Sequence, residues 1–268
     1  MTDWSGESLY HYTTFQALEG ILRNREIWLG NLRYMNDRME MRQFFHSLKE
    51  TIKSEHPEYE EKIENLFKGQ IGRFEGKTAY AFSMSKLCDD AAQWDRYSNS
   101  GRGVCVKFSA GTLLDRVKDK AVLQPVYYSE DMSNHQIKAI IELFIMNGKI
   151  WNGFKTIDEV FENAWACSVA FKHPTFRAED EVRIVSFPFP REGYFTGNLK
   201  YISSRDGLRE YYPVKLCSDV ERNYGGCIEE IILGPCSGVD KNLFFRYLQD
   251  IGADIHSLSI SESKCPLR

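Results

Sequence analysis

Two glutamates stand close together in the segment Phe176–Arg183, at the expected start of a strand. Glu179 and Glu181 would point to the same side there, because alternate residues of a strand share a face. Apolar residues follow directly, and a carboxylate at the mouth of a buried strand is costly unless it is paired or used. Arg183 falls on the same side as Glu181, so a structural salt bridge is the plain alternative to a catalytic role.

Two further candidates lie near the N-terminus. His11 sits in an aromatic run directly before an expected helix start. A histidine at the end of a strand can exchange hydrogen bonds with a sugar hydroxyl, although a lone histidine is more often a satisfied structural residue. Tyr34 stands between a strand and a helix, where its ring could stack on a flat ligand. The nearby Asp37 is better explained as a helix cap.

A denser set of polar and aromatic residues occupies the middle of the chain. Ser83 and Ser85 share one face of an expected strand. Trp94 and Tyr97 would share one face of a short helix, either lining a site or covering a hairpin. The glycines of Gly101-Arg102-Gly103 are explained as well by a hairpin turn as by a phosphate-binding loop.

Composition places the chain in a broad class. It has 268 residues, of which 43% are hydrophobic and 27% charged, and its formal net charge is −4. No linker-like stretch divides it, so we expect a single domain spanning residues 1–268. The mild acidity argues against a general nucleic-acid coat, which needs Lys and Arg to neutralise phosphates. A local basic groove remains compatible with this charge.

Several protein classes are disfavoured by what the sequence lacks. The seven cysteines form no Cys-x-x-Cys pair, and their odd number fits reduced thiols in a cytosol. The N-terminus has no apolar signal segment, and no stretch has the ~18 apolar residues of a membrane span. Neither the cysteines nor the six histidines have the spacing of zinc ligands. We therefore expect a cytoplasmic protein with no membrane contact and no metal.

Hydrophobic periodicity predicts helices early and strands late. Helices are expected over 15–22, 41–52, 57–67, 91–97, 134–147, 157–171 and 241–251, the first of them capped by Thr13 or Thr14. Strands are expected over 9–12, 27–29, 78–85, 104–108, 122–128, 182–187, 199–203, 211–216, 228–233 and 254–260. No strand-helix-strand rhythm repeats, so the pattern predicts an α+β fold rather than a doubly wound parallel sheet.

Taken in order, these segments resemble a bacterial family known only as domain of unknown function 2971. Its recurring features are a Leu-Tyr-x-Tyr-like opening, an aromatic strand ending in Asn-Asp, a Phe-Ser strand, a Trp-x-x-Tyr pair and a late Glu-x-Glu-x-Arg. They appear here as Leu9–Thr13, Ile27–Asp37, Phe82-Ser83, Trp94–Val104 and Glu179–Arg183. The similarity extends from residue 9 to about residue 235. Each piece is short, and their order makes them specific.

That family in turn resembles a divergent ADP-ribosyltransferase. Such enzymes carry a His or Arg on the first strand, an aromatic residue or serine on a central strand, and a late glutamate. Here His11, Ser83-x-Ser85 and Glu179-x-Glu181 stand in that order. The resemblance implies a split, mostly antiparallel β core with the helices of the N-terminal half packed on it.

The resemblance also implies a substrate and a role for each residue. NAD would be the substrate and no metal would be needed. Glu181 would be the catalytic carboxylate, and Glu179 would help to engage the target nucleophile. Tyr34 and Tyr97 are both candidates for stacking on nicotinamide. Eight residues are expected to bind NAD: His11, Tyr12, Thr13, Tyr34, Ser83, Ser85, Trp94 and Tyr97.

The expected activity is mono-ADP-ribosylation of a macromolecule, which is either a nucleic acid (RNA or DNA) or a protein. A toxin or a phage-defence effector would fit such an activity, and an antitoxin protein is then among the expected partners. Two alternatives stay open: an NAD glycohydrolase, which transfers to water, and a non-catalytic binding module on the same fold. A metal nuclease is disfavoured, because the sequence has no spaced set of Asp and Glu with a lysine.

Overall fold

The computed structural model describes most of the chain: residues 3–34, 40–61, 64, 68, 78–128, 138–142, 164–187, 199–204, 207–217, 224, 226–254 and 258–267. The expected cap at Asp37 lies outside these residues, as do most of the expected helix over 134–147 and the first part of the expected helix over 157–171. Within them, helices and strands alternate along the chain without a repeating strand-helix-strand unit.

Ten of the described strands form one sheet. They are β1 (Ser8–Thr13), β2 (Glu26–Asn31), β3 (Tyr80–Ser85), β4 (Val104–Ser109), β5 (Val122–Pro125), β8 (Glu181–Ser186), β9 (Lys200–Ser204), β10 (Gly207–Lys215), β11 (Ile228–Leu233) and β12 (Ser259–Glu262). Their order is β12-β11-β4-β1-β3-β2-β10-β9, with β8 beside β3 and β5 beside β8. Every pair is antiparallel except β11 with β12. The predicted mostly antiparallel α+β architecture is therefore confirmed.

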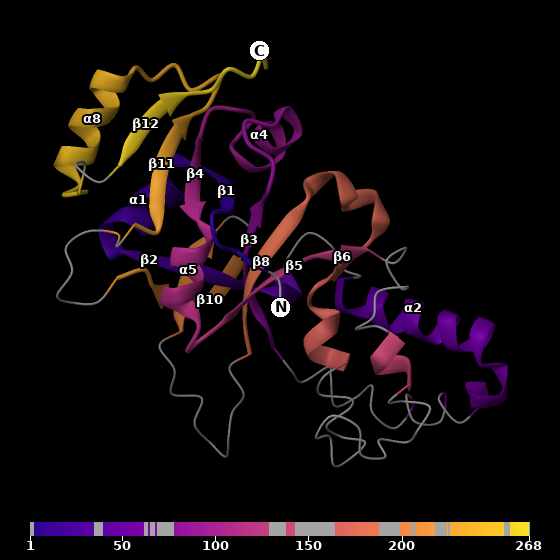
Figure 1. The fold of residues 1–268 in the computed structure, drawn as a ribbon. Helices are drawn as coiled ribbons and strands as arrows, with labels where there is room; N and C mark the ends of the chain where they lie inside the picture. The colour runs from indigo at the N-terminus through magenta and orange to yellow at the C-terminus, as the bar shows by residue number, and fades with distance from the viewer. Residues whose placement is uncertain are drawn as a thin grey trace.

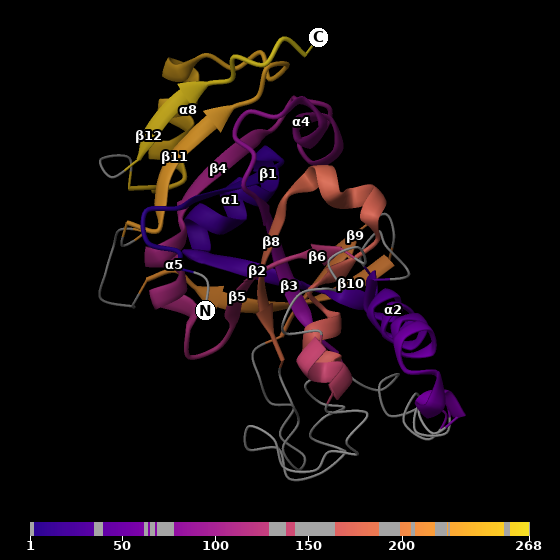
Figure 2. The same cartoon turned by 45° about the vertical axis from the view of Figure 1, so that its right-hand side comes forward.

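The sheet splits along one edge of β3. On its other edge, β3 pairs with β8 over its whole length. On the split edge, β2 pairs only with Tyr80 and Ala81, and β1 pairs only with Ser85. In both views β2 runs across the direction of β4 and β11 (Figures 1 and 2). The strands on the two sides of this split therefore diverge and leave space between them.

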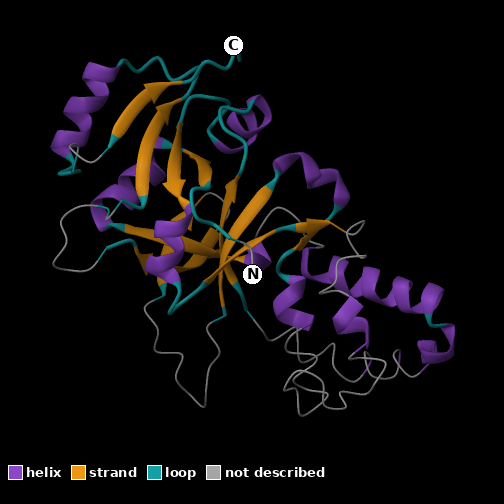
Figure 3. Cartoon of the chain, in the orientation of Figure 1, coloured by secondary structure: helices purple, strands orange, loops and turns teal. Residues whose placement is uncertain are grey.

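The helices cover the sheet from several sides (Figure 3). They are α1 (Phe15–Asn24), α2 (Glu40–Glu55), α4 (Ala91–Tyr97), α5 (Ala110–Val117) and α8 (Lys241–Asp250), with short 3-10 segments η1 (Leu32–Tyr34), η2 (Pro57–Tyr59) and η4 (Pro174–Glu179). The first helix begins at Thr14, whose side chain accepts a hydrogen bond from the Ala17 amide, so Thr14 and not Thr13 is the cap.

The two long helices of the N-terminal half pack differently. The buried face of α1, formed by Leu18, Ile21 and Leu22, joins the main core of the large sheet. By contrast, α2 lies beside a small two-stranded sheet of β6 (Tyr127–Tyr128) and β7 (Phe171–Lys172). Its Phe44 ring meets the Phe171 ring edge to face at 4.9 Å between centroids. The prediction that the helices of the N-terminal half pack on the β core holds for α1 and for α5, whose Leu113 and Val117 join the same core. Helix α2 reaches the large sheet through Phe45, which packs against a cluster that includes Ala81 and Val185.

Three local predictions are wrong. The strand expected over 122–128 breaks at Val126, Phe171 belongs to a strand rather than to a helix, and Asp254 precedes the closing strand. All seven cysteines are free thiols. None of the helices in the described part of the chain is long and apolar enough to cross a bilayer.

Candidate functional site

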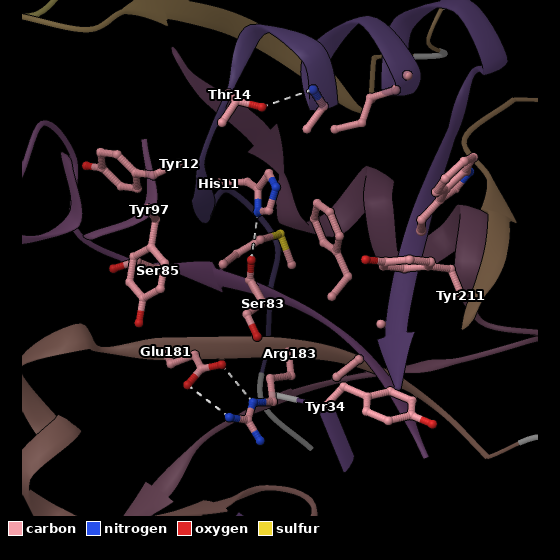
Figure 4. A pocket seen from close by; sticks show the side chains of 18 of the residues that line it. His11, Tyr12, Thr14, Tyr34, Ser83, Ser85, Tyr97, Glu181, Arg183 and Tyr211 are labelled. Carbon is pink, nitrogen blue, oxygen red and sulfur yellow. Dashed lines mark hydrogen bonds and ion pairs between the residues drawn. The ribbon is translucent and has the colours of Figure 1, made fainter. Parts of the chain in front are cut away.

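A cleft of about 1150 Å³ is lined by β1, β2 and β3, from both sides of the split, together with residues of β8. The structure therefore brings together side chains that lie far apart in the sequence (Figure 4). Eight of the ten residues predicted for the site line this cleft: His11, Tyr12, Tyr34, Ser83, Ser85, Tyr97, Glu179 and Glu181. The other two, Thr13 and Trp94, do not line it.

His11 joins the two strands at the split. Its Nδ1 lies 2.8 Å from the Ser83 carbonyl oxygen, and its ring lies over Phe82 at 4.1 Å between centroids. A carbonyl oxygen only accepts, so Nδ1 carries the proton and donates it. Burial lowers the pKa of His11 to about 4, although the Ser83 carbonyl partly opposes this. At neutral pH the ring is therefore uncharged, and its Nε2 is an acceptor available to a ligand hydroxyl.

The low pKa of His11 predicts a pH-dependent stability. The unfolded chain takes up a proton near pH 6.5, whereas the folded chain does so only near pH 4. Stability contributed by the neutral ring is therefore present above pH 6.5 and lost as the pH falls toward 4. In urea titrations at pH 7 and pH 5, His11→Gln should lose less stability on acidification than the parent. The exposed His46→Gln should behave like the parent, and identical behaviour of both variants would contradict a half-buried, neutral His11.

Glu181 is held in a buried ion-pair cluster at the first residue of β8. Its two oxygens accept from Arg183 Nε at 2.7 Å and Nη2 at 3.1 Å, and Lys172 Nζ lies 3.0 Å from Oε2. Burial alone would raise the pKa of Glu181, but the Arg183 guanidinium and the Lys172 ammonium lower it to about 2. The salt bridge left open by the sequence is thus formed. The carboxylate is ionised, oriented and exposed to the cleft only through its 6% accessible surface.

Glu179 belongs to the same cluster but not to the strand. It ends η4, and Asp180, with a left-handed φ of 41°, turns the chain before β8 begins. Its Oε1 accepts from the Tyr97 hydroxyl at 2.7 Å and from Arg96 Nη1 at 3.0 Å. Its Oε2 accepts from Lys172 Nζ at 2.7 Å. Glu179 is therefore a buried carboxylate that accepts from three donors, not a free carboxylate that faces an incoming nucleophile.

Lys172 connects the two glutamates and was missed by the sequence analysis. Its ammonium reaches both carboxylates, which raise its pKa despite the opposing effect of burial. Within the cluster, two carboxylates face three cations, Lys172, Arg96 and Arg183. The surplus positive charge favours an anionic ligand next to it.

The two serines of β3 have different environments. The Ser85 hydroxyl donates to the Glu179 carbonyl at 2.7 Å and accepts from the Leu87 amide at 3.0 Å, so it fixes the chain and has no proton left to donate to a ligand. The Ser83 Oγ is buried and has no hydrogen-bond partner among the described residues. It points toward Glu181 and Arg183 (Figure 4), and as a nearby donor it helps to lower the pKa of Glu181 without reaching good hydrogen-bond geometry.

The candidate aromatic residues also divide. Tyr34 has 51% of its surface exposed, whereas Tyr97 is 36% exposed and anchored to Glu179 through its hydroxyl. The Tyr12 hydroxyl is used between the Leu87 carbonyl and the Asp90 amide. Tyr34 is thus the candidate whose ring has most freedom to stack on a ligand. Tyr211, on the same side of the cleft in Figure 4, and its neighbour Trp28 were not predicted.

Thr13 and Trp94 do not line the cleft, in contrast to the prediction, and the structure gives one of the glycines, Gly103, a packing role. Trp94 is fully buried, packs edge to face on Tyr12 at 4.9 Å and donates to Asp89 at 2.7 Å, so it supports the site from behind. Thr13 is buried, and its carbonyl would lie 2.1 Å from a Cβ placed on Gly103. Gly103 is therefore required for close backbone packing, and the Gly-x-Gly segment is not a phosphate loop.

Comparison with known proteins gives one match. No curated protein and no solved structure matches the chain. A family described as "Protein of unknown function (DUF2971)" matches residues 93–184. That segment contains neither His11 nor Ser83. It does contain all five residues of the ion-pair cluster, which are Arg96, Lys172, Glu179, Glu181 and Arg183. Over residues 93–184, the chain is therefore similar to the DUF2971 family of proteins of unknown function.

Proposed function

We propose that the chain binds NAD in the cleft and transfers ADP-ribose from it to a macromolecule. The observation that supports this most is the meeting of His11, Ser83 and Glu181, from three strands, at the split of an antiparallel sheet. A split core is what the resemblance to ADP-ribosyltransferases predicts. The cleft volume of about 1150 Å³ lies just above the roughly 300–1,000 Å³ of typical small-molecule sites, so the cleft has room for a ligand as large as a dinucleotide.

Glu181 supplies the electrostatic part of the chemistry. The bond between nicotinamide and C1′ of the ribose breaks, nicotinamide leaves with the bonding electrons, and positive charge develops on the sugar. The acceptor nucleophile then bonds to C1′ and loses its proton. A fixed carboxylate next to the ribose opposes the growing charge, as in glycoside hydrolysis. Because its pKa is about 2, Glu181 is ionised at neutral pH and acts as a charge rather than as an acid.

Hydrogen-bond capacity is left for the substrate in this arrangement. A carboxylate offers about four acceptor positions. Glu181 uses three of them on Arg183 and Lys172, two at Oε2 and one at Oε1. One position at Oε1 and the His11 Nε2 therefore remain for ribose hydroxyls. The surplus positive charge of the cluster complements the diphosphate of NAD.

A stacking role for Tyr34 gives a direct prediction. Tyr34→Ala should weaken NAD binding severalfold with little change in the unfolding midpoint, because the ring is half exposed at 51%. Stacking on an aromatic ring contributes about 0.5–1.5 kcal/mol. Tyr34→Phe keeps the ring and should bind NAD like the parent. Calorimetric titration would test both, and equal affinity of the Ala variant and the parent would leave Tyr97 as the stacking residue.

The proposal itself is tested by chemical analysis of the reaction. The purified protein should release nicotinamide from NAD, and radiolabel from the adenylate part should appear on a macromolecule from cell extract. Release without any labelled polymer would identify an NAD glycohydrolase. Absence of both, with the protein folded, would refute an enzymatic role.

A non-catalytic binding module is the second candidate, and one observation favours it. Glu181 is bound on both oxygens by Arg183, the arrangement expected of a purely structural salt bridge. Such a module would bind NAD or another anionic ligand without releasing nicotinamide. Calorimetry combined with nicotinamide analysis separates the two candidates.

A further inference from the structure

A second, smaller cavity beside the cleft is strongly basic. Its volume is about 280 Å³, and it is lined by Arg23, Asn24, Arg25, Glu26, Lys200, Lys215 and Cys217. Four of these residues are cations, of which Arg23 is paired with Glu19 at 2.6 Å, and Glu26 is the single carboxylate among the described residues that line the pocket. In a chain with a net charge of −4, this is a local concentration of positive charge. We call it the basic pocket.

Glu26 lines both the cleft and the basic pocket and so connects them. It is buried at 3% exposure and accepts from Trp28 Nε1 at 2.7 Å and from the Lys200 ammonium. Lys215 Nζ lies farther away, at 3.7 Å from Oε2. One carboxylate thus faces two lysines, and Arg25 adds a further positive charge. The pocket keeps a positive surplus after its internal pairing.

An aromatic pair adjoins the basic pocket on the cleft side. The Lys200 ammonium lies 5.1 Å from the Trp28 ring centroid, and the Trp28 and Tyr211 rings lie 5.7 Å apart. Both rings line the cleft. A cationic pocket next to aromatic rings matches one nucleotide of a single strand, whose phosphate needs cations and whose base stacks on rings. A protein acceptor offers no such pairing of an anionic backbone with flat bases.

We propose that the basic pocket binds a backbone phosphate of a single-stranded nucleic acid, and that this strand is the acceptor of ADP-ribose. The binding of the nucleic acid rests on the basic pocket and on the adjoining Trp28 and Tyr211 rings. Its role as the acceptor rests on the proposed function of the cleft. The basic pocket lies at the Glu26 end of β2, whereas β2 pairs with β3 at its Gly30 end. The nucleic acid would therefore bind at one end of β2, and NAD would bind along the rest of β2 in the cleft.

Arg25 offers a variant that separates binding from folding. It ends α1 in the left-handed conformation, with φ 51° and ψ 41°. Glycine adopts this conformation without the steric penalty of a side chain and is the preferred residue at such helix ends. Arg25→Gly therefore removes a charge while its melting temperature stays at or above that of the parent. Lys215→Ala is the second variant, because Glu26 keeps its Lys200 and Trp28 partners.

The test measures fluorescence anisotropy of labelled single-stranded RNA and DNA oligonucleotides over a range of salt concentrations. The parent should bind, with an affinity that falls as salt rises. Each variant should bind more weakly, and its slope of log affinity against log salt should be less negative by about 0.7, the value for one phosphate contact on a single strand. Lys53→Ala, on the distant helix α2, removes one exposed charge and should keep the parental slope.

Several results would overturn the proposal. They are no oligonucleotide binding at low salt, parental slopes in both variants, or binding of inorganic phosphate without binding of the strand. A rise in the KM for NAD equal to the loss of oligonucleotide affinity would assign the pocket to the diphosphate of NAD instead. Transfer of label to protein with none to the oligonucleotide would refute the acceptor role. Nicotinamide release is also measured without an acceptor. If release persists, the proposed function of the cleft stands and only the nucleic-acid proposal fails.

Discussion

Glu181→Gln should lower the rate of nicotinamide release by on the order of 10²–10³, the usual cost of removing one preorganised electrostatic group. The amide keeps the size and one acceptor oxygen but removes the charge that faces the ribose. NAD affinity, measured by calorimetry, should change little because His11, Ser83 and Tyr34 remain. The variant also leaves Lys172 and Arg183 with one carboxylate fewer, so the assay is run below its unfolding temperature.

Glu179→Gln is the matched control for this experiment. It removes the same charge from the same cluster and disturbs the same lysine. It should be destabilised to a similar extent while retaining nicotinamide release. Equal loss of activity in both variants would show that the cluster matters only as a structural unit. Full activity of Glu181→Gln would remove Glu181 from the mechanism.

Arg183→Ala should lower the free energy of unfolding by about 3–5 kcal/mol, the cost of removing one partner of a buried ion pair. Arg183 is fully buried and also donates to the Val169 carbonyl at 2.8 Å, so its loss leaves unsatisfied groups in the interior. This is a large part of the 5–15 kcal/mol that stabilises a typical protein. Urea unfolding monitored by fluorescence provides the measurement.

An exposed ion pair supplies the comparison. Arg23→Ala breaks the pair with Glu19, whose side chains are 48% and 38% exposed, and should cost only about 0–1 kcal/mol. Arg183→Lys keeps the charge but cannot form the two parallel bonds to Glu181, so its cost should fall between the two. If Arg183→Ala unfolds at the same urea concentration as the parent, the bidentate pair between Arg183 and Glu181 does not form in solution. The Glu181 carboxylate is then not held in place by Arg183.

Much of the fold was predictable because its signals are local. The strand Ile228–Leu233 was predicted with its observed bounds, since three of its six residues are β-branched isoleucines, which favour strands. The short helix Ala110–Val117 was not predicted. Its apolar residues Ala110, Leu113, Leu114 and Val117 do follow helical spacing, so a local signal was present and was missed. Gly111 in the first turn weakens that signal, because glycine has a low helix propensity.

The site was predictable only in part because its geometry depends on chain reversals. Glu179 and Glu181 do lie side by side, yet through a left-handed Asp180 and a shared Lys172, not through strand alternation. No local sequence pattern indicates that the Lys172 side chain would contact both glutamates. Trp94 and Tyr97 are three residues apart on a helix, which leaves them about 60° apart in projection. That offset is enough to bury Trp94 while Tyr97 reaches the cleft.

The most direct test of the central claim is a crystal structure of the parent protein with a non-hydrolysable NAD analogue. The account predicts that the analogue occupies the cleft, with the 2′-hydroxyl of the nicotinamide ribose about 2.6–3.2 Å from the Glu181 carboxylate. The nicotinamide ring should lie against Tyr34, and His11 Nε2 should accept from a ribose hydroxyl. An analogue bound outside the cleft, or one whose nicotinamide ribose is beyond hydrogen-bonding distance of Glu181, would contradict it.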